Sequence, residues 1–569
     1  MTSSPDALLA SIADAGAQFQ RVWMNLATAM PVGIPGAAST PRAAELHAGF
    51  ARDQAALWRA MLERSPAGAR PVVARPDPGD RRFASREWND DPYYDYLKQS
   101  YLLAARYLTA LADDAPLEGQ ARERLRFAIR QWVDALCPAN FAATNPEALK
   151  AAVETRGESL TRGLANLLAD ARRGRIRQTD EGAFALGRDL ATTPGAVVLE
   201  NDLMQLIQYA PTTAQVGARP LVMVPPCINK FYILDLQPGN SFVRHALAQG
   251  HTVFMVSWRN VREDQGHRTW DDYLELGVFA ALRAAREISG ADQVNALGFC
   301  VGGTLLGAAL AVMGANGEDW VASATYLTTL LDFHDAGQIG LFVDEASVAQ
   351  REAALGGGGI LHASELAGVF SALRANDLVW PYVVNNYLKG GSPAAFDLLY
   401  WNADSTNLPG PMYAWYLRNT YLENRLCQPG GVESCGVPVD LGRARMPAFV
   451  LATREDHIVP WRSAYRSLRH LGGDVQFVLG ASGHVAGVIN PAASGKRSHW
   501  AGTSQPEDAD AWLAVATEEK GSWWPRWARW LEGFKGGLRD APASPGNDRY
   551  RALEAAPGRY VKEKAREEN

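Results

Sequence analysis

Residues 294–304 read Val-Asn-Ala-Leu-Gly-Phe-Cys-Val-Gly-Gly-Thr, and this stretch decides the fold class of the 569-residue chain. A short apolar run precedes Gly298, and an apolar segment rich in small residues follows Cys300. A strand, a sharp turn and a helix in this order form a nucleophile elbow, which closes because small residues flank the nucleophile two positions away on each side. The stretch predicts an α/β-hydrolase fold with Cys300 as the nucleophile, at a helix N-terminus whose dipole favours a thiolate.

Further short apolar runs on both sides of the elbow predict the rest of a buried, mainly parallel sheet. They are residues 221–224, 252–256, 322–327, 448–451 and 475–479. Helical patterns separate several of these runs: residues 241–249 end at Gly250, and residues 269–288 place apolar side chains on one stripe. Strands that alternate with helices predict an α/β sheet covered on both faces.

The remaining regions suggest a division into two domains. In the first 195 residues, apolar side chains recur at three-to-four spacing, which predicts a mainly helical N-terminal domain over residues 1–195 without catalytic groups. Residues 196–569 would form the catalytic domain. An insertion at about residues 333–440 is rich in Trp, Tyr and Gly, and so long a break between core strands is typical of a functional lid. We expect this insertion to be a cap.

Two residues downstream complete a candidate catalytic triad. An α/β-hydrolase places an acid and then a histidine after later strands. Asp456 follows the predicted strand at 448–451, and His484 follows the one at 475–479. Both should therefore emerge at the same sheet edge as Cys300. The order and spacing predict a triad in which Cys300 is the nucleophile, His484 the general base and Asp456 the acid.

Three other side chains compete for these roles. Glu455 competes for the acid, and His457 competes for the base. His457 ranks second because no strand would separate it from the acid beside it. Cys227 is a second cysteine near the expected site, but it has no elbow around it and is interpreted as a small packing residue.

An oxyanion hole in this fold uses two backbone N–H groups. One comes from the residue after the nucleophile, which is Val301 here. The other comes from the loop after an earlier strand, which corresponds to residues 225–230, with Ile228 as the candidate donor.

Composition excludes several classes of protein. The chain has 56 Lys+Arg against 62 Asp+Glu, a formal net charge of −6, which argues against a polycationic nucleic-acid binder. Five cysteines without a C-x-x-C pair indicate neither a disulfide framework nor a metal site. The start of the sequence lacks the layout of a secretory signal, so we expect a cytoplasmic protein. The uncharged run at residues 293–317 contains several glycines, so we interpret it as the elbow strand and helix and not as a transmembrane segment.

Several long strings resemble the polyhydroxyalkanoate synthases, specifically the single-subunit class (class I) that prefers short 3-hydroxyacyl-CoA monomers. They are Pro-Pro-Cys-Ile-Asn-Lys-Phe-Tyr-Ile-Leu-Asp-Leu-Gln-Pro at 225–238, Val-Ser-Trp-Arg-Asn at 256–260, the elbow, Trp-Asn at 401–402, Asn-Leu-Pro-Gly-Pro at 407–411 and Arg-Glu-Asp-His-Ile-Val-Pro-Trp at 454–461. The resemblance covers most of the chain and shows no departure at a candidate catalytic position.

The resemblance implies an acyltransferase that polymerises (R)-3-hydroxyacyl-CoA, with 3-hydroxybutyryl-CoA as the expected monomer, and releases CoA through an acyl-cysteine intermediate. It implies the triad already derived, with Asp235 as a supporting residue. His457, beside the acid, is a further supporting candidate. It places Trp401 in a region that family members use for dimer contact or surface interaction. The implied protein is a cytoplasmic homodimer with a mobile cap at the surface of polymer granules. It would contact the growing polyester and granule-associated proteins, and it would need no metal, cofactor, nucleic acid or transmembrane segment.

Three other functions stay open at this point. A cysteine-nucleophile hydrolase, such as a polyester depolymerase or a thioesterase, would use the same elbow. A synthase that prefers medium-chain monomers would share the same strings. A granule-coating or scaffold protein would rely on the helices of residues 1–195, although an intact triad makes this role secondary.

Overall fold

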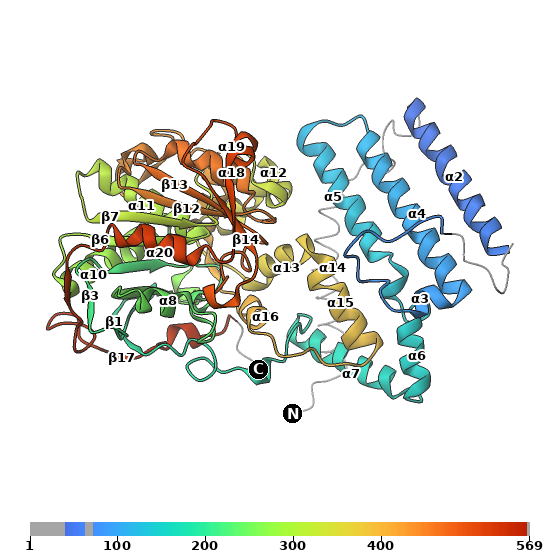
Figure 1. Ribbon diagram of the computed structural model, residues 1–569, viewed down its shortest axis with the longest axis horizontal. Helices are drawn as coiled ribbons and strands as arrows, with labels where there is room; N and C mark the ends of the chain where they lie inside the picture. Colours follow the sequence, from blue (N-terminus) through green and yellow to red (C-terminus); the bar gives the residue numbers. More distant parts are fainter. Residues whose placement is uncertain (1–39, 63–71, 566–569) are drawn as a thin grey trace. The chain divides into compact units, whose positions relative to one another are not determined.

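An eleven-stranded mixed sheet forms the centre of one of the two units into which the chain divides. The structure is a computed structural model that describes residues 40–62 and 72–565 (Figure 1). The unit with the sheet, called the catalytic unit below, comprises the described residues of Glu181–Ala367 and Phe396–Asn569. The strands, in spatial order, are β15 (Thr517–Lys520), β14 (Ser498–Ala501), β13 (Val475–Gly480), β12 (Ala448–Thr453), β7 (Val321–Leu327), β6 (Val294–Phe299), β4 (Leu221–Val224), β5 (Val253–Trp258), β2 (Met204–Tyr209), β1 (Gly195–Glu200) and β17 (Glu554–Ala555).

The six central strands, from β13 to β5, pair in parallel. They are the six apolar runs that the sequence predicts as buried strands, with small shifts at their ends. The outer strands β2, β1, β17, β14 and β15 pair antiparallel, and the sequence patterns did not indicate them. The predicted α/β-hydrolase fold class is confirmed, with antiparallel strands at both edges of the sheet.

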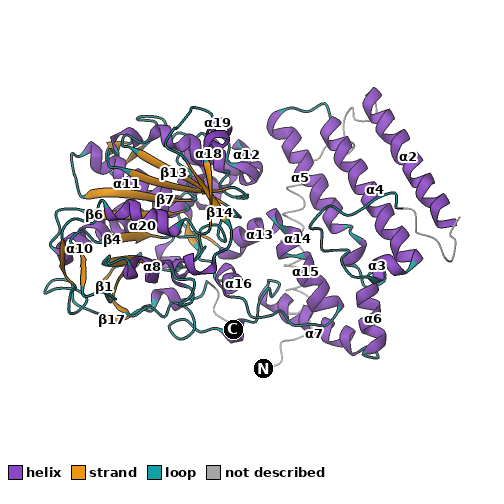
Figure 2. Ribbon diagram, viewed as in Figure 1, coloured by secondary structure: helices purple, strands orange, loops and turns teal. Residues whose placement is uncertain are grey.

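Both faces of this sheet are covered by helices, as the near-continuous apolar strands require. Within β4, Val222 and Val224 contribute to a core cluster that includes α10 (Ala280–Ser289) and α11 (Val301–Ala315). The other two residues of β4, Leu221 and Met223, contribute to a second cluster on the opposite face. This cluster includes α8 (Phe242–Ala248) and α20 (Trp524–Glu532). Figure 2 shows these helices flanking the strands.

The predicted helix at residues 269–288 is divided in the structure. It consists of α9 (Trp270–Asp272), the π-helical segment η5 (Tyr273–Phe279) and α10. Thr269 begins it with a capping box, in which the Thr269 hydroxyl accepts a hydrogen bond from the Asp272 backbone and the Asp272 carboxylate accepts one from the Thr269 backbone. The capping box at Thr269 therefore fixes the start of this helix at the first residue of the predicted range.

The segment between β7 and β12 is mainly helical and does not all belong to the catalytic unit. The helices α12 (Glu345–Leu355) and α17 (Gly410–Tyr416) and the π-helical η8 (Leu417–Leu422) lie in it. Residues Gly368–Ala395 instead group with the N-terminal helices. The predicted cap at 333–440 is thus split between the two units.

The other unit comprises the described residues of Met1–Asp180 together with Gly368–Ala395, and it is helical. The helices α2 (Pro41–Leu62), α4 (Pro92–Asp114) and α5 (Gly119–Ala135) pack side by side (Figure 1). Further helices of the unit include α3 (Glu87–Asp90), α6 (Pro146–Glu154), α7 (Glu158–Arg173), α14 (Ala375–Leu378), α15 (Trp380–Tyr382) and η7 (Val383–Leu388). Gly163 lets α7 approach η7, since a Cβ at this position would lie 1.9 Å from the Tyr387 carbonyl oxygen. The unit boundary falls after Asp180, whereas the sequence pattern placed it after residue 195.

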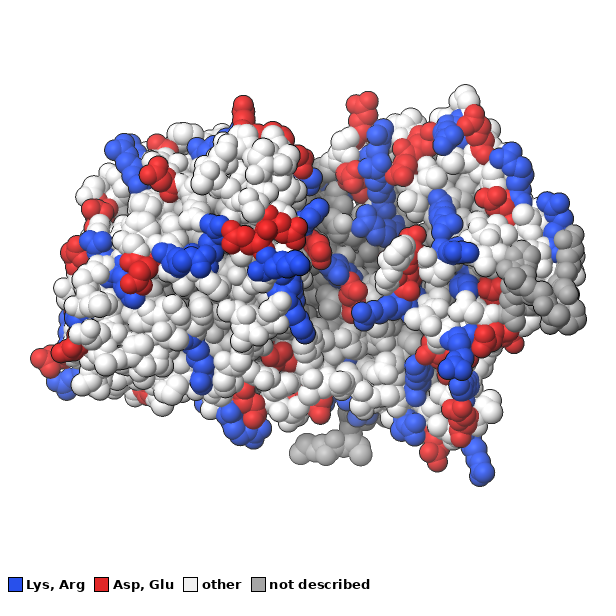
Figure 3. Space-filling model, viewed as in Figure 1, with Lys and Arg blue, Asp and Glu red and all other residues white. Residues whose placement is uncertain are grey.

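Within residues 40–62 and 72–565, no helix is both long and apolar enough to cross a membrane. The uncharged run at 293–317 consists of β6 and the 15-residue helix α11, as predicted. Figure 3 shows Lys and Arg side chains interspersed with Asp and Glu over the face in view. This pattern agrees with the small formal net charge of −6.

Candidate active site

Cys300 lies between the end of β6 and the start of α11, and its backbone is strained. Its φ of 54° and ψ of −129° lie in a region that residues with a side chain rarely adopt. Tight packing holds the turn: a Cβ on Gly298 would lie 2.4 Å from the Gly303 Cα. The Cys300 N–H donates to the Leu327 carbonyl at 2.9 Å, which anchors the turn to β7. The result is a partly exposed thiol at a helix N-terminus.

The two other predicted triad residues contact one another. His484, after β13, places its Nδ1 2.8 Å from Oδ2 of Asp456, after β12. The Asp456 side chain has no exposed surface. Its Oδ1 accepts hydrogen bonds from the N–H groups of Ile458 (2.9 Å) and Val459 (2.8 Å), and Thr453 Oγ1 donates to Oδ2 at 3.2 Å. These bonds compensate for burying a charged carboxylate and fix its orientation toward the imidazole.

His484 is also linked to the thiol electrostatically, because the Cys300 side chain is one of the groups that raise the pKa of its imidazole. The imidazole stacks on the Phe299 ring, with centroids 5.6 Å apart and an interplanar angle of 26°. Burial lowers the pKa of His484, but the charge and hydrogen bonds of Asp456 and Cys300 outweigh burial and raise it to about 10. The site therefore favours the protonated form of His484. A general base that accepts the Cys300 proton needs this stabilisation of its protonated form.

The competing residues occupy different positions. Glu455 is exposed, and its backbone N–H donates to the Ser482 carbonyl at 3.0 Å. His457 is half-buried beside Asp456, whose carboxylate contacts His484. Cys227 is fully buried, and burial raises the pKa of its thiol to about 12. This geometry favours Asp456, His484 and Cys300 over the three competitors.

The elbow packs directly on the loop predicted to complete the oxyanion hole. A Cβ on Gly302 would lie 2.3 Å from the Val224 carbonyl oxygen and 2.5 Å from that of Pro225, so only a glycine allows this approach. Val301 is the first residue of α11. Ile228 follows in the loop after β4, and its carbonyl accepts from the Thr406 N–H at 2.8 Å. Both predicted amide donors thus lie in backbone segments that meet at the elbow.

Asp235, a supporting residue according to the resemblance, and Trp401, which the resemblance places in a dimer-contact or surface region, are both buried in the catalytic unit. Asp235 accepts hydrogen bonds from Thr193 Oγ1 (2.5 Å) and Ser241 Oγ (2.6 Å), and burial raises the pKa of its carboxyl. The indole N–H of Trp401 donates to the Lys230 carbonyl at 2.7 Å. Ser241 is the N-cap of α8, so Asp235 helps to order the start of this helix. Trp401 packs inside the unit, with only 6% of its surface exposed.

Two tyrosines near the thiol are not among the predicted site residues. They are Tyr416 and Tyr421; both hydroxyls are buried, and burial is the main cause that raises the pKa of each. The neighbouring Cys300 raises both pKa values further, and Asp456 makes a smaller contribution at Tyr421. Its ring lies 5.5 Å from that of Tyr416 and 4.9 Å from that of Phe333, edge to face in both cases. The aromatic content of the predicted cap was the available signal, but it did not show which rings lie near the thiol.

Comparisons with known proteins show which family and which relatives this chain is similar to. The family model described as "Poly-beta-hydroxybutyrate polymerase (PhaC) N-terminus" matches residues 79–246, and the one described as "alpha/beta hydrolase fold" matches residues 220–491. The chain is 56% identical over 521 residues to the poly(3-hydroxyalkanoate) polymerase subunit PhaC of Cupriavidus necator, which covers 91% of this chain and 87% of that protein. It is 41% identical over 514 residues to the corresponding subunit of Rhizobium meliloti (90% and 84%), and 42% identical over 492 residues to poly(3-hydroxyalkanoate) polymerase 2 of Ectopseudomonas oleovorans (86% and 87%).

Proposed function

The chain belongs to the poly(3-hydroxyalkanoate) polymerases, which are acyltransferases, and from this premise we propose that it joins (R)-3-hydroxyacyl-CoA monomers into polyester. The proposed monomer is 3-hydroxybutyryl-CoA, and CoA is the released product. The observation that carries the proposal is the 2.8 Å contact of His484 with the buried Asp456, together with the strained elbow that presents Cys300 at the start of α11. The intermediate would be a thioester between the acyl group and Cys300.

In the first half of the reaction, His484 removes the Cys300 proton and the thiolate attacks the thioester carbonyl of the monomer. The amides of Val301 and Ile228 are the proposed donors to the oxyanion that forms. When the C–S bond to CoA breaks, His484 returns its proton to the CoA sulfur. Asp456 stabilises the imidazolium between these two transfers, consistent with the raised pKa of His484. One thioester is replaced by another, so the acyl group stays activated.

In the second half, the 3-hydroxyl of another acyl unit attacks the acyl-cysteine. His484 accepts the hydroxyl proton, an ester bond forms, and the proton returns to the Cys300 sulfur as it leaves. Water would attack the same intermediate and release free acid, so the site must favour the alcohol. The rings of Tyr416, Tyr421 and Phe333 supply apolar surface close to the thiol, which supports transfer to an alcohol over hydrolysis.

The test is to incubate the purified chain with 3-hydroxybutyryl-CoA and to measure released CoA, insoluble polyester and free 3-hydroxybutyrate separately. We expect CoA and polyester to increase together. Accumulation of free acid without polyester would instead show a thioesterase. A depolymerase would degrade added polyester and leave the CoA ester intact. Repeating the assay with 3-hydroxyoctanoyl-CoA distinguishes a short-chain from a medium-chain preference.

The catalytic residue is tested by Cys300→Ala, which should abolish both CoA release and polymer formation in a folded protein. Cys435→Ser is the matched control, because Cys435 is also a partly exposed free cysteine of the same unit. Retention of substantial CoA release by Cys300→Ala would refute the assignment.

We also propose that the chain acts as a homodimer at the surface of polymer granules in the cytoplasm, in contact with the growing polyester and granule-associated proteins. The N-terminal unit supports this proposal, because Leu160, Leu164 and Leu167 follow one face of α7 and are 45%, 57% and 44% exposed. Exposed apolar side chains at this spacing are suited to an apolar partner. Replacing the three leucines with Ser should reduce co-sedimentation with isolated granules without changing CoA release. Light scattering of the purified chain tests the dimer.

A further inference from the structure

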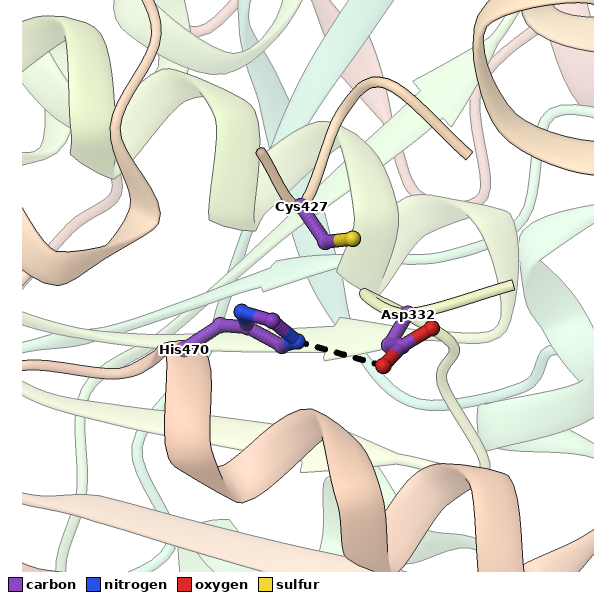
Figure 4. A group of neighbouring side chains, drawn as sticks. All are labelled: Asp332, Cys427 and His470. Carbon is purple, nitrogen blue, oxygen red and sulfur yellow. Dashed lines mark hydrogen bonds and ion pairs between the residues drawn. The ribbon is translucent and has the colours of Figure 1, made fainter. Parts of the chain in front are cut away.

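Three side chains outside the triad meet in the catalytic unit: Asp332, Cys427 and His470 (Figure 4). One ligand atom of each lies within 4.8 Å of the other two. They come from the segment after β7, the segment after η8 and the end of η10 (Leu468–His470), respectively. We propose that these three residues form a binding site for one Zn²⁺ ion, which joins the cap segment that follows η8 to the catalytic core.

The donor atoms converge in the way that such a site requires. His470 Nε2 lies 3.2 Å from Asp332 Oδ2. Figure 4 shows the Cys427 thiol facing this pair. In tetrahedral zinc sites the bonds to S, N and O are about 2.0–2.3 Å, which places ligand atoms about 3.5 Å from each other. The cluster therefore needs side-chain shifts of only about an ångström to surround an ion.

The chemistry of the three groups selects zinc among common divalent ions. A thiolate, an imidazole and a carboxylate are all zinc ligands, whereas Mg²⁺ and Ca²⁺ prefer oxygen alone. The thiolate and the carboxylate together carry two negative charges, which balance those of the ion. Asp332 and Cys427 are 5% and 9% exposed, while the His470 side chain is 27% exposed. The more exposed histidine side provides a route for the ion and a place for a water molecule as fourth ligand.

Hydrogen bonds around the cluster orient the ligands in advance, as is typical of zinc sites. Asp332 Oδ1 accepts from Asn424 Nδ2 (2.8 Å) and from the His334 N–H (2.9 Å), which turns Oδ2 toward His470. The Cys427 thiol donates to the Asn424 carbonyl at 3.3 Å. On binding, a Zn–S bond replaces the S–H bond and the proton leaves to solvent. The hydrogen bond between Asp332 and His470 breaks as both groups turn to the ion, and the ion is neither oxidised nor reduced.

A metal here would act on the position of the cap and not on the chemical step. Cys427 follows η8, which carries Tyr421, one of the two tyrosines near the thiol. Asp332 closely follows Thr329, whose Oγ1 donates to the Cys300 carbonyl at 3.3 Å. The ion would thus connect a segment at the elbow to the segment that holds Tyr421. Because it binds the folded chain, it should also stabilise that fold.

The experiment uses the full chain with Cys300→Ala, because the triad itself offers a thiol and an imidazole to zinc. Zn²⁺ binding is measured by competition with a chromogenic chelator, and stoichiometry is measured by elemental analysis after dialysis. The comparison adds Cys427→Ser or His470→Gln, and Cys435→Ser is the matched control on the same cap segment. We expect one Zn²⁺ per chain in the parent and the control. Loss of an outer-shell partner alone weakens metal binding by about 10–100-fold, so loss of a ligand in the other two variants should weaken binding by at least about 100-fold or abolish it.

Two further readouts keep the proposal testable if the ligand variants fold poorly. Co²⁺ added to the Cys300→Ala parent should give a near-ultraviolet thiolate-to-metal absorption band, which Cys435→Ser leaves unchanged. Zn²⁺, but not Mg²⁺, should raise the Tm of the parent. Absence of stoichiometric zinc in the parent overturns the proposal, and so does zinc binding by a folded Cys427→Ser variant with parental affinity.

Discussion

The Nδ1 atom of His484 lies 2.8 Å from Oδ2 of Asp456, a carboxylate with no exposed surface. The two residues follow neighbouring parallel strands, β12 and β13, whose carboxyl ends meet at one edge of the sheet. A buried carboxylate stabilises the adjacent imidazolium, so this contact links the proton on His484 to the stability of the fold.

The first prediction concerns the pH dependence of stability. Despite burial, the pKa of His484 is raised from 6.5 to about 10, so its protonated form stabilises the folded state. This contribution is complete below about pH 6.5 and is lost as the pH rises through about 10. Asp456→Asn should remove it. Urea unfolding from pH 6 to 10 should show a stability difference between wild type and Asp456→Asn that shrinks as the pH increases.

The control for this experiment is Glu455→Gln, which removes the exposed carboxyl next to Asp456. Its unfolding free energy should follow the wild-type pH profile. A stability difference for Asp456→Asn that is constant from pH 6 to 10 would contradict a coupled Asp456–His484 pair.

The second prediction separates the two halves of the reaction. Asp456→Asn should still allow acylation of Cys300 at a reduced rate, because His484 and the elbow remain. It should impair elongation more strongly, because a hydroxyl is a weaker acid than a thiol and depends more on an oriented base. The rates to compare are single-turnover CoA release and polymer growth. Equal losses in both would indicate that Asp456 only orients His484.

The third prediction concerns thiol reactivity. Burial raises the pKa of Cys137 and Cys427 to about 11 and that of Cys227 and Cys435 to about 12. Because the thiolate is the reactive form, these four should react slowly at pH 8. Iodoacetamide should label Cys300 first, and peptide mass spectrometry measures the order. Labelling of Cys435 at a similar rate in the native protein would contradict the prediction.

The fourth prediction tests the elbow packing. Gly302→Ala forces a Cβ to within 2.3 Å of the Val224 carbonyl oxygen, which belongs to rigid backbone. Overpacking of this kind costs roughly 1–3 kcal/mol, and here it should also abolish CoA release by displacing the oxyanion loop. Gly239→Ala is the control, because a Cβ there meets no atom within 4 Å. Denaturant unfolding together with the CoA assay checks both effects.

The central strands could be predicted from the sequence because they are buried on both faces, which makes them short, continuous apolar runs. The edge strands lack this signal. β15 (Thr517–Lys520) is mostly exposed and polar, and β14 (Ser498–Ala501) alternates buried and less buried residues over only four positions. Their identity depends on pairing with a neighbour that lies elsewhere in the sequence. The assignment of Gly368–Ala395 to the N-terminal unit likewise depends on tertiary packing.

The candidate site likewise contains some residues that the sequence predicts and others that only the folded structure identifies. Cys300, Asp456 and His484 could be inferred because each follows a recognisable strand and the fold dictates their order. Tyr421 could not be selected from the many aromatic residues of the cap, since only the folded chain brings it near the thiol. The Asp332–Cys427–His470 cluster has no short-range spacing pattern, so the sequence pattern had indicated no metal site.

The last prediction assigns Tyr421 a role in keeping water from the acyl-cysteine. Its ring contacts Phe333 edge to face, with centroids 4.9 Å apart. Burial, with a contribution from the nearby Cys300, raises the pKa of its hydroxyl. Tyr421→Ala opens space beside the thiol, so water should compete better with the 3-hydroxyl of the next unit. The fraction of released acyl groups recovered as free 3-hydroxybutyrate should rise several-fold. Tyr421→Phe keeps the ring and should leave this fraction near the wild-type value.

Trp415→Ala is the matched control, because it removes a large ring of α17 that stacks on Trp270 at 4.4 Å. It should lower stability without changing the partition between polymer and free acid. If Trp415→Ala and Tyr421→Ala raise free acid equally, general loosening of the cap explains the effect. If only Tyr421→Ala raises the fraction of free acid, the exclusion of water depends on the Tyr421 ring next to the thiol. This exclusion of water would then be the feature that distinguishes a polymerase from a hydrolase on this fold.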